Sequence, residues 1–160
     1  MVDELPEAAE TTPPSGAETS LEEAQLQVDF SIMTIDAEPD AVFLDTSVSG
    51  GMVTLGYGKG DGTYRLLITE LRAETDLNVL EKSIASGTNI SPVTVGGEDG
   101  FWIEGAPHVV VLFDRDGQFI EDSARLAGNT LLFVRDGVTV RIEGALELDQ
   151  ALDVAAQLQP

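Results

Sequence analysis

Three Asp-Gly pairs, at Asp99-Gly100, Asp116-Gly117 and Asp136-Gly137, divide the second half of the chain into short apolar segments. Gly accepts a positive φ without steric cost and Asp tolerates it, so each pair allows a strand to reverse and to pair with its predecessor. The segment 96–144 is therefore predicted to form an antiparallel sheet.

The size and composition of the chain predict one folded domain behind a linker. The 160 residues, 42% of them hydrophobic, suffice for a single sizeable core. Residues 1–19 contain acids, Ala, Thr and Pro but no Lys, Arg or aromatic residue that could anchor them. We therefore expect residues 1–19 to be a disordered acidic linker and residues 20–160 to be a single domain.

The first half of that domain is predicted to combine helices with a hairpin. Ser20 and Glu23 form a capping-box pattern that predicts a short first helix. A middle helix is expected to begin at Thr75 and to end at Gly87. Apolar, turn-bounded runs predict strands at 41–44, 52–57 and 64–71, the last two joined by the Gly-rich turn 58–62.

From Pro92 onward strands dominate, and a final helix closes the chain. Apolar residues at 138, 140 and 142 alternate with Thr139, Arg141 and Glu143, which predicts a half-buried strand with the polar side chains in water. Residues 148–158 carry an amphipathic helical pattern and should lie across the sheet. The expected fold class is α+β, an antiparallel twisted sheet of about nine strands packed by about three helices.

The charge and the residue types exclude several function classes. The net charge of −21, from 29 acids and 8 bases, repels nucleic acid and anionic lipid; it fits a solvated acidic surface or cation binding. The absence of Cys excludes disulfides, thiolate zinc sites and cysteine nucleophiles. The longest apolar run, 109–113, is far shorter than the roughly 20 residues of a membrane helix. The start lacks secretory-signal features, so either the chain is cytosolic or Met1 is not its native start.

Two segments imitate ligand-binding loops without meeting their requirements. In the Gly-rich segment 56–62, Asp61 stands where a dinucleotide fingerprint needs Gly, and a strand rather than a helix is expected to follow. If the segment 114–117 belonged to a calcium loop, its first and twelfth positions would be Leu112 and Ser123, neither of them a carboxylate. No cofactor and no metal site is therefore predicted.

Four residues are candidates for binding a ligand or a partner, and none is a predicted catalytic residue. Trp102 should lie on the face opposite its two neighbours, where it is either an exposed interaction residue or covered by a helix. His108, the single histidine, either caps a strand start or responds to pH, and no Gly-x-Ser-x-Gly elbow accompanies it. Arg125 and Asn129 flank a short segment in which they stabilise a turn, pair with acids, or bind a partner.

One block of sequence resembles a known family. It begins with Gly96-Gly97 and continues through Gly100-Phe101-Trp102-Ile103-Glu104-Gly105-Ala106-Pro107-His108. Segments 125–132, 136–139, 141–144 and 149–152 follow in the same order, and 20–24 is similar to the family's opening. These residues resemble a bacterial, actinobacterial-type domain of unknown function. That domain is found as the C-terminal extracytoplasmic part of single-span membrane proteins, some of them similar to anti-sigma factors.

The resemblance implies a non-enzymatic extracytoplasmic sensory or interaction domain of a membrane-anchored regulator, with residues 1–19 as the remainder of a linker. Its partner would be a protein or an envelope ligand. One alternative is a carrier of a hydrophobic envelope ligand, because an antiparallel sheet covered by helices can enclose an apolar cavity; this is an analogy at the level of fold. Another is an acidic cytosolic binding module, and a hydrolase would need a cleft that joins His108 to a carboxylate and a hydroxyl.

Overall fold

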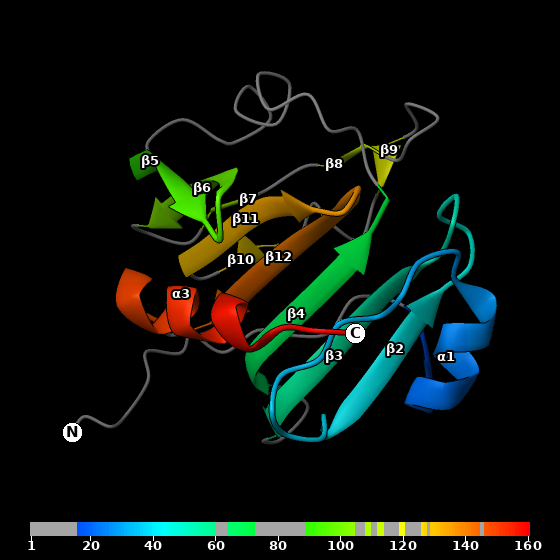
Figure 1. The fold of residues 1–160 in the computed structure, drawn as a ribbon. Helices are drawn as coiled ribbons and strands as arrows, with labels where there is room; N and C mark the ends of the chain where they lie inside the picture. Colours follow the sequence, from blue (N-terminus) through cyan, green and yellow to red (C-terminus); the bar gives the residue numbers. More distant parts are fainter. Residues whose placement is uncertain are drawn as a thin grey trace.

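Eight antiparallel strands form one sheet in the computed structural model, with two helices on one of its faces (Figure 1). The structure describes residues 16–59, 64–72, 89–104, 108–109, 112–113, 119–120, 126–127, 129–144 and 146–160. In spatial order the strands are β1 (Ala17–Thr19), β2 (Ala41–Asp45), β3 (Met52–Lys59), β4 (Tyr64–Leu71), β12 (Val138–Gly144), β11 (Asn129–Arg135), β6 (Glu98–Glu104) and β5 (Asn89–Val95). The helices are α1 (Leu21–Gln27) and α3 (Leu148–Gln157).

The predicted α+β class with an antiparallel sheet is confirmed, whereas the counts of elements are slightly off. The described residues form eight strands in the main sheet and two helices, where about nine strands and three helices were expected. Two small two-stranded sheets accompany them: β7 (His108–Val109) with β10 (Leu126–Ala127), and β8 (Leu112–Phe113) with β9 (Phe119–Ile120). The middle helix predicted from Thr75 to Gly87 lies outside the described residues.

The three Asp-Gly pairs have different outcomes. Asp136 and Gly137, with φ of 54° and 78°, form the two-residue turn between β11 and β12, as predicted. Asp99-Gly100 is not a turn, because Gly96 and Gly97, with φ of 58° and 90°, reverse the chain between β5 and β6. Gly100 instead lies in β6, where a Cβ would come within 2.7 Å of the Leu132 carbonyl oxygen. The third pair, at 116–117, lies outside the described residues.

The N-terminal boundary of the folded part begins slightly earlier than expected. Residues 17–19, assigned above to the linker, form strand β1 and pair with β2. Helix α1 follows at once, and the Ser20 hydroxyl accepts a hydrogen bond of 3.1 Å from the Glu23 backbone N–H, as the capping pattern predicts. The chain is therefore anchored to the edge of the sheet before its first helix begins.

Replacing Ser20 by Ala should lower the free energy of unfolding by about 1 kcal/mol, because the first turn of α1 would lose its side-chain acceptor. Chemical denaturation would measure the change. Ser20→Thr keeps the acceptor and should stay within about 0.5 kcal/mol of the wild type. Equal losses in both variants would contradict a capping role.

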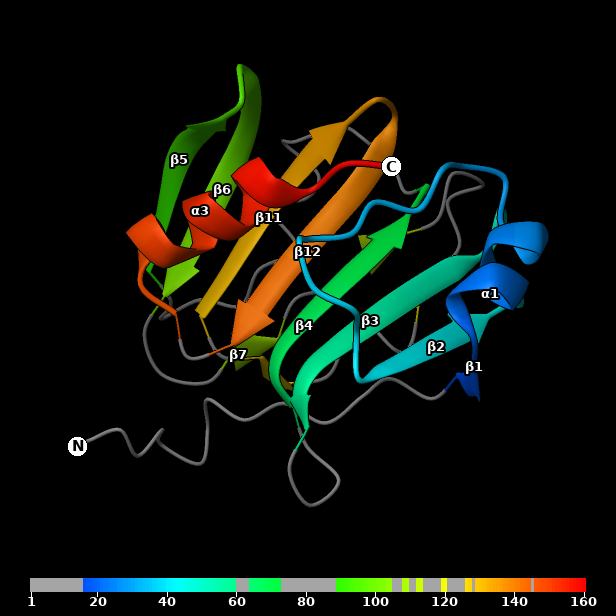
Figure 2. The same ribbon diagram turned by 60° about the horizontal axis from the view of Figure 1, so that its bottom comes forward.

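Helix α3 lies across β11 and its neighbours on the same face of the sheet as α1 (Figure 2). Ala151 and Ala155 are completely buried, Leu148 and Leu152 are half-buried, and Leu158 is buried just after the helix. This confirms the predicted amphipathic stripe. The Glu147 backbone N–H donates to the Gln150 side chain at 2.9 Å and so closes the N-terminal end.

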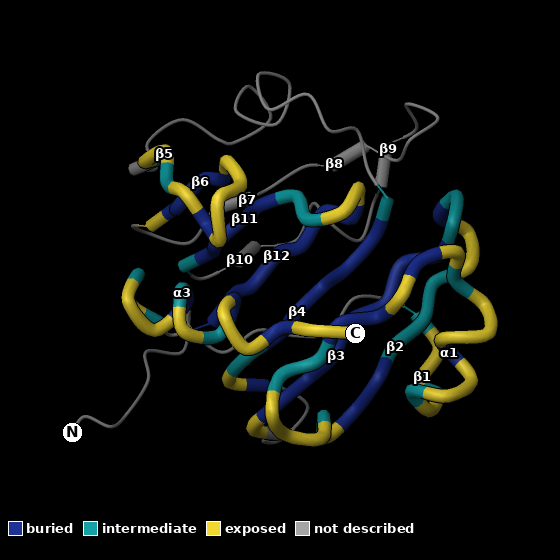
Figure 3. The backbone as a smooth tube through the Cα atoms, viewed as in Figure 1, coloured by how far each residue is buried: buried dark blue, intermediate teal, exposed yellow. Residues whose placement is uncertain are grey.

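The centre of the sheet is buried on both faces, as the tube in Figure 3 shows for the middle strands. On the first face, which carries the helices, apolar side chains such as Val53, Ile68 and Phe133 form the main core. The second face buries Met52, Leu71, Phe101, Ile103 and Leu132.

The second face also corrects one prediction. Thr139, Arg141 and Glu143 were expected in water, yet each is at most 1% exposed. The alternation along β12 is correct, because these three side chains face away from Val140 and its neighbours, but both faces of the strand are covered. A period of two identifies opposite faces and does not say which of them water reaches.

Between the two helices, the first face is covered by irregular chain. Residues 28–36, here called the strap, leave α1 and cross over β4 and β3 toward the C-terminal segment before the chain returns to β2 (Figure 2). Phe30, Ile32 and Met33 of the strap are buried. Thr34 and Gln159 exchange backbone hydrogen bonds of 3.0 and 3.1 Å in an isolated β-bridge. The strap thus joins the N-terminal and C-terminal parts of the domain over the sheet.

Candidate binding cleft beneath the strap

A cleft of about 520 Å³ opens between the strap, the end of β4 and the β11–β12 turn. Its walls combine apolar, acidic and basic side chains from parts of the sequence far from one another. The lining residues are Gln25, Val28, Asp29, Phe30, Ser31, Met33, Arg72, Arg135, Asp136, Val138 and Pro160.

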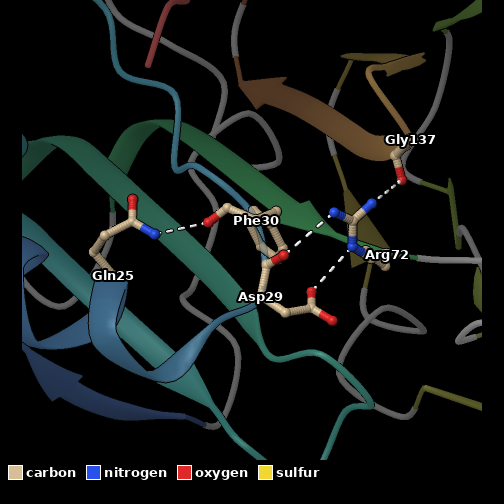
Figure 4. A network of polar contacts seen from close by, with 5 residues as sticks. All are labelled: Gln25, Asp29, Phe30, Arg72 and Gly137. Carbon is tan, nitrogen blue, oxygen red and sulfur yellow. Dashed lines mark hydrogen bonds and ion pairs between the residues drawn. The ribbon is translucent and has the colours of Figure 1, made fainter.

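Arg72 ties three of these segments together (Figure 4). Its Nε donates to Asp29 Oδ1 at 3.0 Å and its Nη2 to the Asp29 carbonyl oxygen at 3.2 Å. Its Nη1 donates to the Gly137 carbonyl oxygen at 3.3 Å. One guanidinium at the end of β4 therefore holds both the strap and the β11–β12 turn.

Gln25 of α1 fixes the other side of the strap. Its Nε2 donates to the Phe30 carbonyl oxygen at 2.7 Å, and its Oε1 accepts from the Ile32 backbone N–H at 2.9 Å. A side-chain amide that binds both a donor and an acceptor of the backbone imitates a strand partner. The strap residues on the cleft wall are thereby positioned without secondary structure of their own.

Arg135 has a different set of partners. Its Nη1 donates to the carbonyl oxygens of Ala155 and Leu158, at 3.2 and 3.4 Å, where α3 ends. A cation at a helix C-terminus is stabilised by the carbonyl dipoles. The guanidinium carbon also lies 5.0 Å from the centre of the Phe133 ring. Among the described residues, no carboxylate pairs with Arg135, so its Nε and Nη2 edge is open to an anionic group.

Glu70 lies below the strap on the first face of the sheet. In the register, its neighbours across β3 and β12 are Val53 and Val140. The side chain is completely buried, and its Oε1 accepts from the Met33 backbone N–H at 2.8 Å, while Oε2 has no partner among the described residues. Burial raises the pKa of Glu70 to about 8, only partly offset by the bond from Met33. A carboxyl in this position is stable in its protonated form at neutral pH.

Tyr57 is the second buried polar group on this face. Its hydroxyl has no hydrogen-bond partner among the described residues. Burial raises the pKa of Tyr57 to about 12; the nearby Ile35 backbone lowers it in part, and the charges of Glu70 and Asp40 raise it further. Tyr57 therefore stays neutral throughout the range in which Glu70 titrates.

The turn at Gly137 supports the cleft through Arg72, which gives a testable consequence. A Cβ at Gly137, where φ is 78°, would lie 3.0 Å from Arg72 Nη1, whereas a Cβ at Gly97, where φ is 90°, would meet nothing within 4 Å. Gly97→Ala should therefore cost about 1 kcal/mol of backbone strain alone. Gly137→Ala should cost more, because Arg72 must also move. Equal losses of unfolding free energy in the two variants would show that the Arg72 contact contributes nothing.

Of the four residues that the sequence singles out, the structure describes the side chains of two. Trp102 is 4% exposed and lies on the face opposite Phe101 and Ile103, as predicted, with its Nε1 donating to Glu104 Oε2 at 3.2 Å. Asn129 Nδ2 donates to the Leu146 carbonyl oxygen at 2.8 Å, on the path into α3. Neither side chain lines the cleft.

The structure does not describe the side chains of the other two candidates, His108 and Arg125. The backbone of His108 pairs with Ala127 between β7 and β10, and its side chain lies outside the described part. Arg125 lies outside the described residues altogether. The structure thus does not bring the four candidates together, and the cleft is made by other residues.

Those residues carry weak sequence signals. Glu70 is the single acid in a strand that otherwise reads Leu-Leu-Ile-Thr before it and Leu after it, and such an acid can be recognised as a buried-carboxyl candidate. Arg72, Asp29 and Gln25 belong to segments joined only by the fold, so no local spacing reveals their contacts.

A buried ion pair lies on the second face of the sheet. Arg141 Nε and Glu143 Oε1 are 3.5 Å apart, and the two side chains are 1% and 0% exposed. Thr54 and Thr69, whose hydroxyls are 3.2 Å apart, continue the row from Arg141 across β4 and β3. The polar half of β12 is thus part of a buried polar strip.

Comparison of the chain with protein-family models, curated proteins and solved structures gave no match. Within the described part, no helix is long and apolar enough to cross a membrane. The same residues contain no group of three or more His, Cys, Asp or Glu side chains arranged to hold a metal ion.

Proposed function

We propose that this chain is a non-enzymatic binding domain, the extracytoplasmic part of a membrane-anchored regulator, that receives a partner protein or an envelope ligand in the cleft beneath the strap. The observation that carries the binding role is the cleft itself. Its lining includes Arg135, which has no carboxylate partner in the described part of the chain, together with apolar Phe30 and Val138, in a chain with 29 acids. A ligand with a carboxylate or phosphate next to an apolar group fits this combination. The extracytoplasmic placement is supported by the family resemblance of residues 96–108.

The proposed extracytoplasmic location is tested on the natural gene product. We expect a protein that is longer than this chain, is bound to membranes and is digested by protease added outside intact cells. A protected, soluble species of about 17 kDa would contradict the proposal and would leave the acidic cytosolic binding module.

The cleft is tested by placing a photo-crosslinking amino acid at Ser31, on the cleft wall, and comparing it with the same group at Leu26, which is 80% exposed on α1 and outside the cleft. The experiment uses the full-length protein in intact cells. A discrete adduct from position 31 and none from position 26 supports the cleft. An adduct with the mass of a lipid would favour the hydrophobic carrier, and identical patterns from both positions would contradict the proposal.

Arg135→Lys should reduce the yield of that adduct at limiting partner concentration by about tenfold, because Lys keeps the charge but cannot form two parallel hydrogen bonds with one anionic group. The matched control is Arg65→Lys, at an exposed arginine that does not line the cleft. An undiminished yield from the Arg135 variant would remove Arg135 from the binding role.

A further inference from the structure

We propose that the strap, residues 28–36, is a proton-controlled cover of the sheet: it is closed while the Glu70 carboxyl holds a proton, and it opens with release of that proton to solvent. This goes beyond the proposed function and does not require that the cleft bind a ligand.

The geometry gives the closed strap a direct connection to Glu70. The Met33 backbone N–H in the middle of the strap donates to Oε1 at 2.8 Å, and Oε2 is buried with no partner among the described residues. With its partners among the described residues, a carboxylate that kept its charge in this position would have one hydrogen bond and no counter-ion, which is costly in an apolar environment. Closure therefore requires the protonated form, and opening returns the carboxyl to water.

Among the described residues, the charged and titratable groups around Glu70 do not neutralise a carboxylate there. Directly after the strand of Glu70, Arg72 is bound to Asp29 of the strap and to the Gly137 carbonyl oxygen. From β3, Tyr57 stays neutral because burial raises its pKa to about 12. From β12 the register neighbour is Val140, and Arg135 of β11 is bound to carbonyl oxygens at the end of α3.

The other attachments of the strap are individual contacts and the packing of Phe30, Ile32 and Met33 against the main core. The individual contacts include the two hydrogen bonds from Gln25, the contacts of Arg72 with Asp29, the Asp29 N–H bond to the Gly50 carbonyl oxygen, the Asp36 N–H bond to Gln157 Oε1, and the β-bridge of Thr34 with Gln159. No helix or sheet hydrogen-bond ladder crosses the strap in the described structure, so it can separate from the sheet without breaking the strands below. Local openings of this kind cost less free energy than global unfolding.

The direction of the pH effect follows from the two states of the carboxyl. An open strap gives Glu70 the ordinary pKa of a solvated glutamate, whereas burial raises the pKa of the closed state to about 8. Between these values the open state binds fewer protons, so opening becomes easier as pH rises from about 4.5 to about 8 and then levels off.

Hydrogen exchange of the Met33 amide, followed by NMR between pH 5.5 and 7.5 and corrected for the intrinsic exchange rate, tests the proposal. In the wild type the protection factor should fall at least tenfold over this range, and exchange should be insensitive to low urea. The control amide is that of Ile68 in the central strand, whose exchange should follow global unfolding and depend on urea. Glu70→Gln keeps the oxygen that accepts from Met33 but cannot ionise, so its Met33 protection should not change with pH.

Two results would overturn the proposal. One is exchange of Met33 with the same urea dependence as Ile68, which would mean that the strap leaves the sheet only when the whole domain unfolds. The other is an equal fall in protection with pH in the wild type and in Glu70→Gln. If the variant does not fold, the wild-type pH series and its urea dependence decide, since a protection factor that does not change with pH contradicts proton control.

Discussion

Glu70→Gln is expected to raise the free energy of unfolding at pH 7 by about 3 kcal/mol, in contrast to most substitutions of completely buried polar residues. Burial raises the pKa of Glu70 to about 8 in the folded protein, while in the unfolded chain this carboxyl ionises near pH 4.5. Between these pH values the unfolded state binds fewer protons, so the wild type loses stability as pH rises. The amide variant has no proton to bind in either state and avoids that loss.

The measurement is chemical denaturation of both proteins at several pH values. The difference in their unfolding free energies should be small near pH 4, grow through neutral pH, and level off above pH 8. Glu38→Gln, at an exposed position, removes one acid from the same highly charged chain and serves as the control for net charge. Parallel pH profiles for the wild type and Glu70→Gln would mean that Glu70 is ionised in the folded protein.

The second large effect is expected on the opposite face of the sheet. Arg141→Met or Glu143→Met should each cost about 3 kcal/mol, because each removes the opposite charge that lies 3.5 Å from a completely buried side chain. The double variant should cost less than the sum of the two, since neither buried charge of the pair remains.

Unfolding free energies of the four proteins in this cycle give the coupling between the two charges. Thr139→Val removes a buried hydroxyl on the same face and strand without changing charge, and it should cost less than either single variant. Additive losses for Arg141 and Glu143 would show that the two side chains act separately.

Much of the pattern of strands and helices could be predicted from the sequence. The run 64–71 coincides with β4, the capping pattern at Ser20 begins α1, and the apolar stripe from Leu148 marks α3. These features depend on neighbours within a few residues along the chain. The prediction of a turn at Asp99-Gly100 was wrong, because Gly96 and Gly97 reverse the chain with two positive φ angles. Gly100 instead lies where β6 comes so close to β11 that a side chain would not fit.

The cleft depends on contacts that no local pattern encodes. Arg72 meets Asp29 and Gly137 only after β4 is placed between the strap and β12, and Glu70 meets Met33 across 37 residues of sequence. The burial of Arg141 was missed for a related reason: alternation along one strand identifies a face but not what covers it. Polar residues whose role depends on a distant partner are therefore the part of this protein that sequence reasoning reaches last.

Pro92, in the middle of strand β5, affects how this protein behaves at high concentration. Strand β5 is an outer strand of the eight-stranded sheet, and its residues 91, 92 and 94 are exposed. Proline has no N–H, so a strand from another copy of the chain that approached this edge would find a gap in the row of hydrogen-bond donors. This border of the sheet is thereby a poor template for edge-to-edge aggregation.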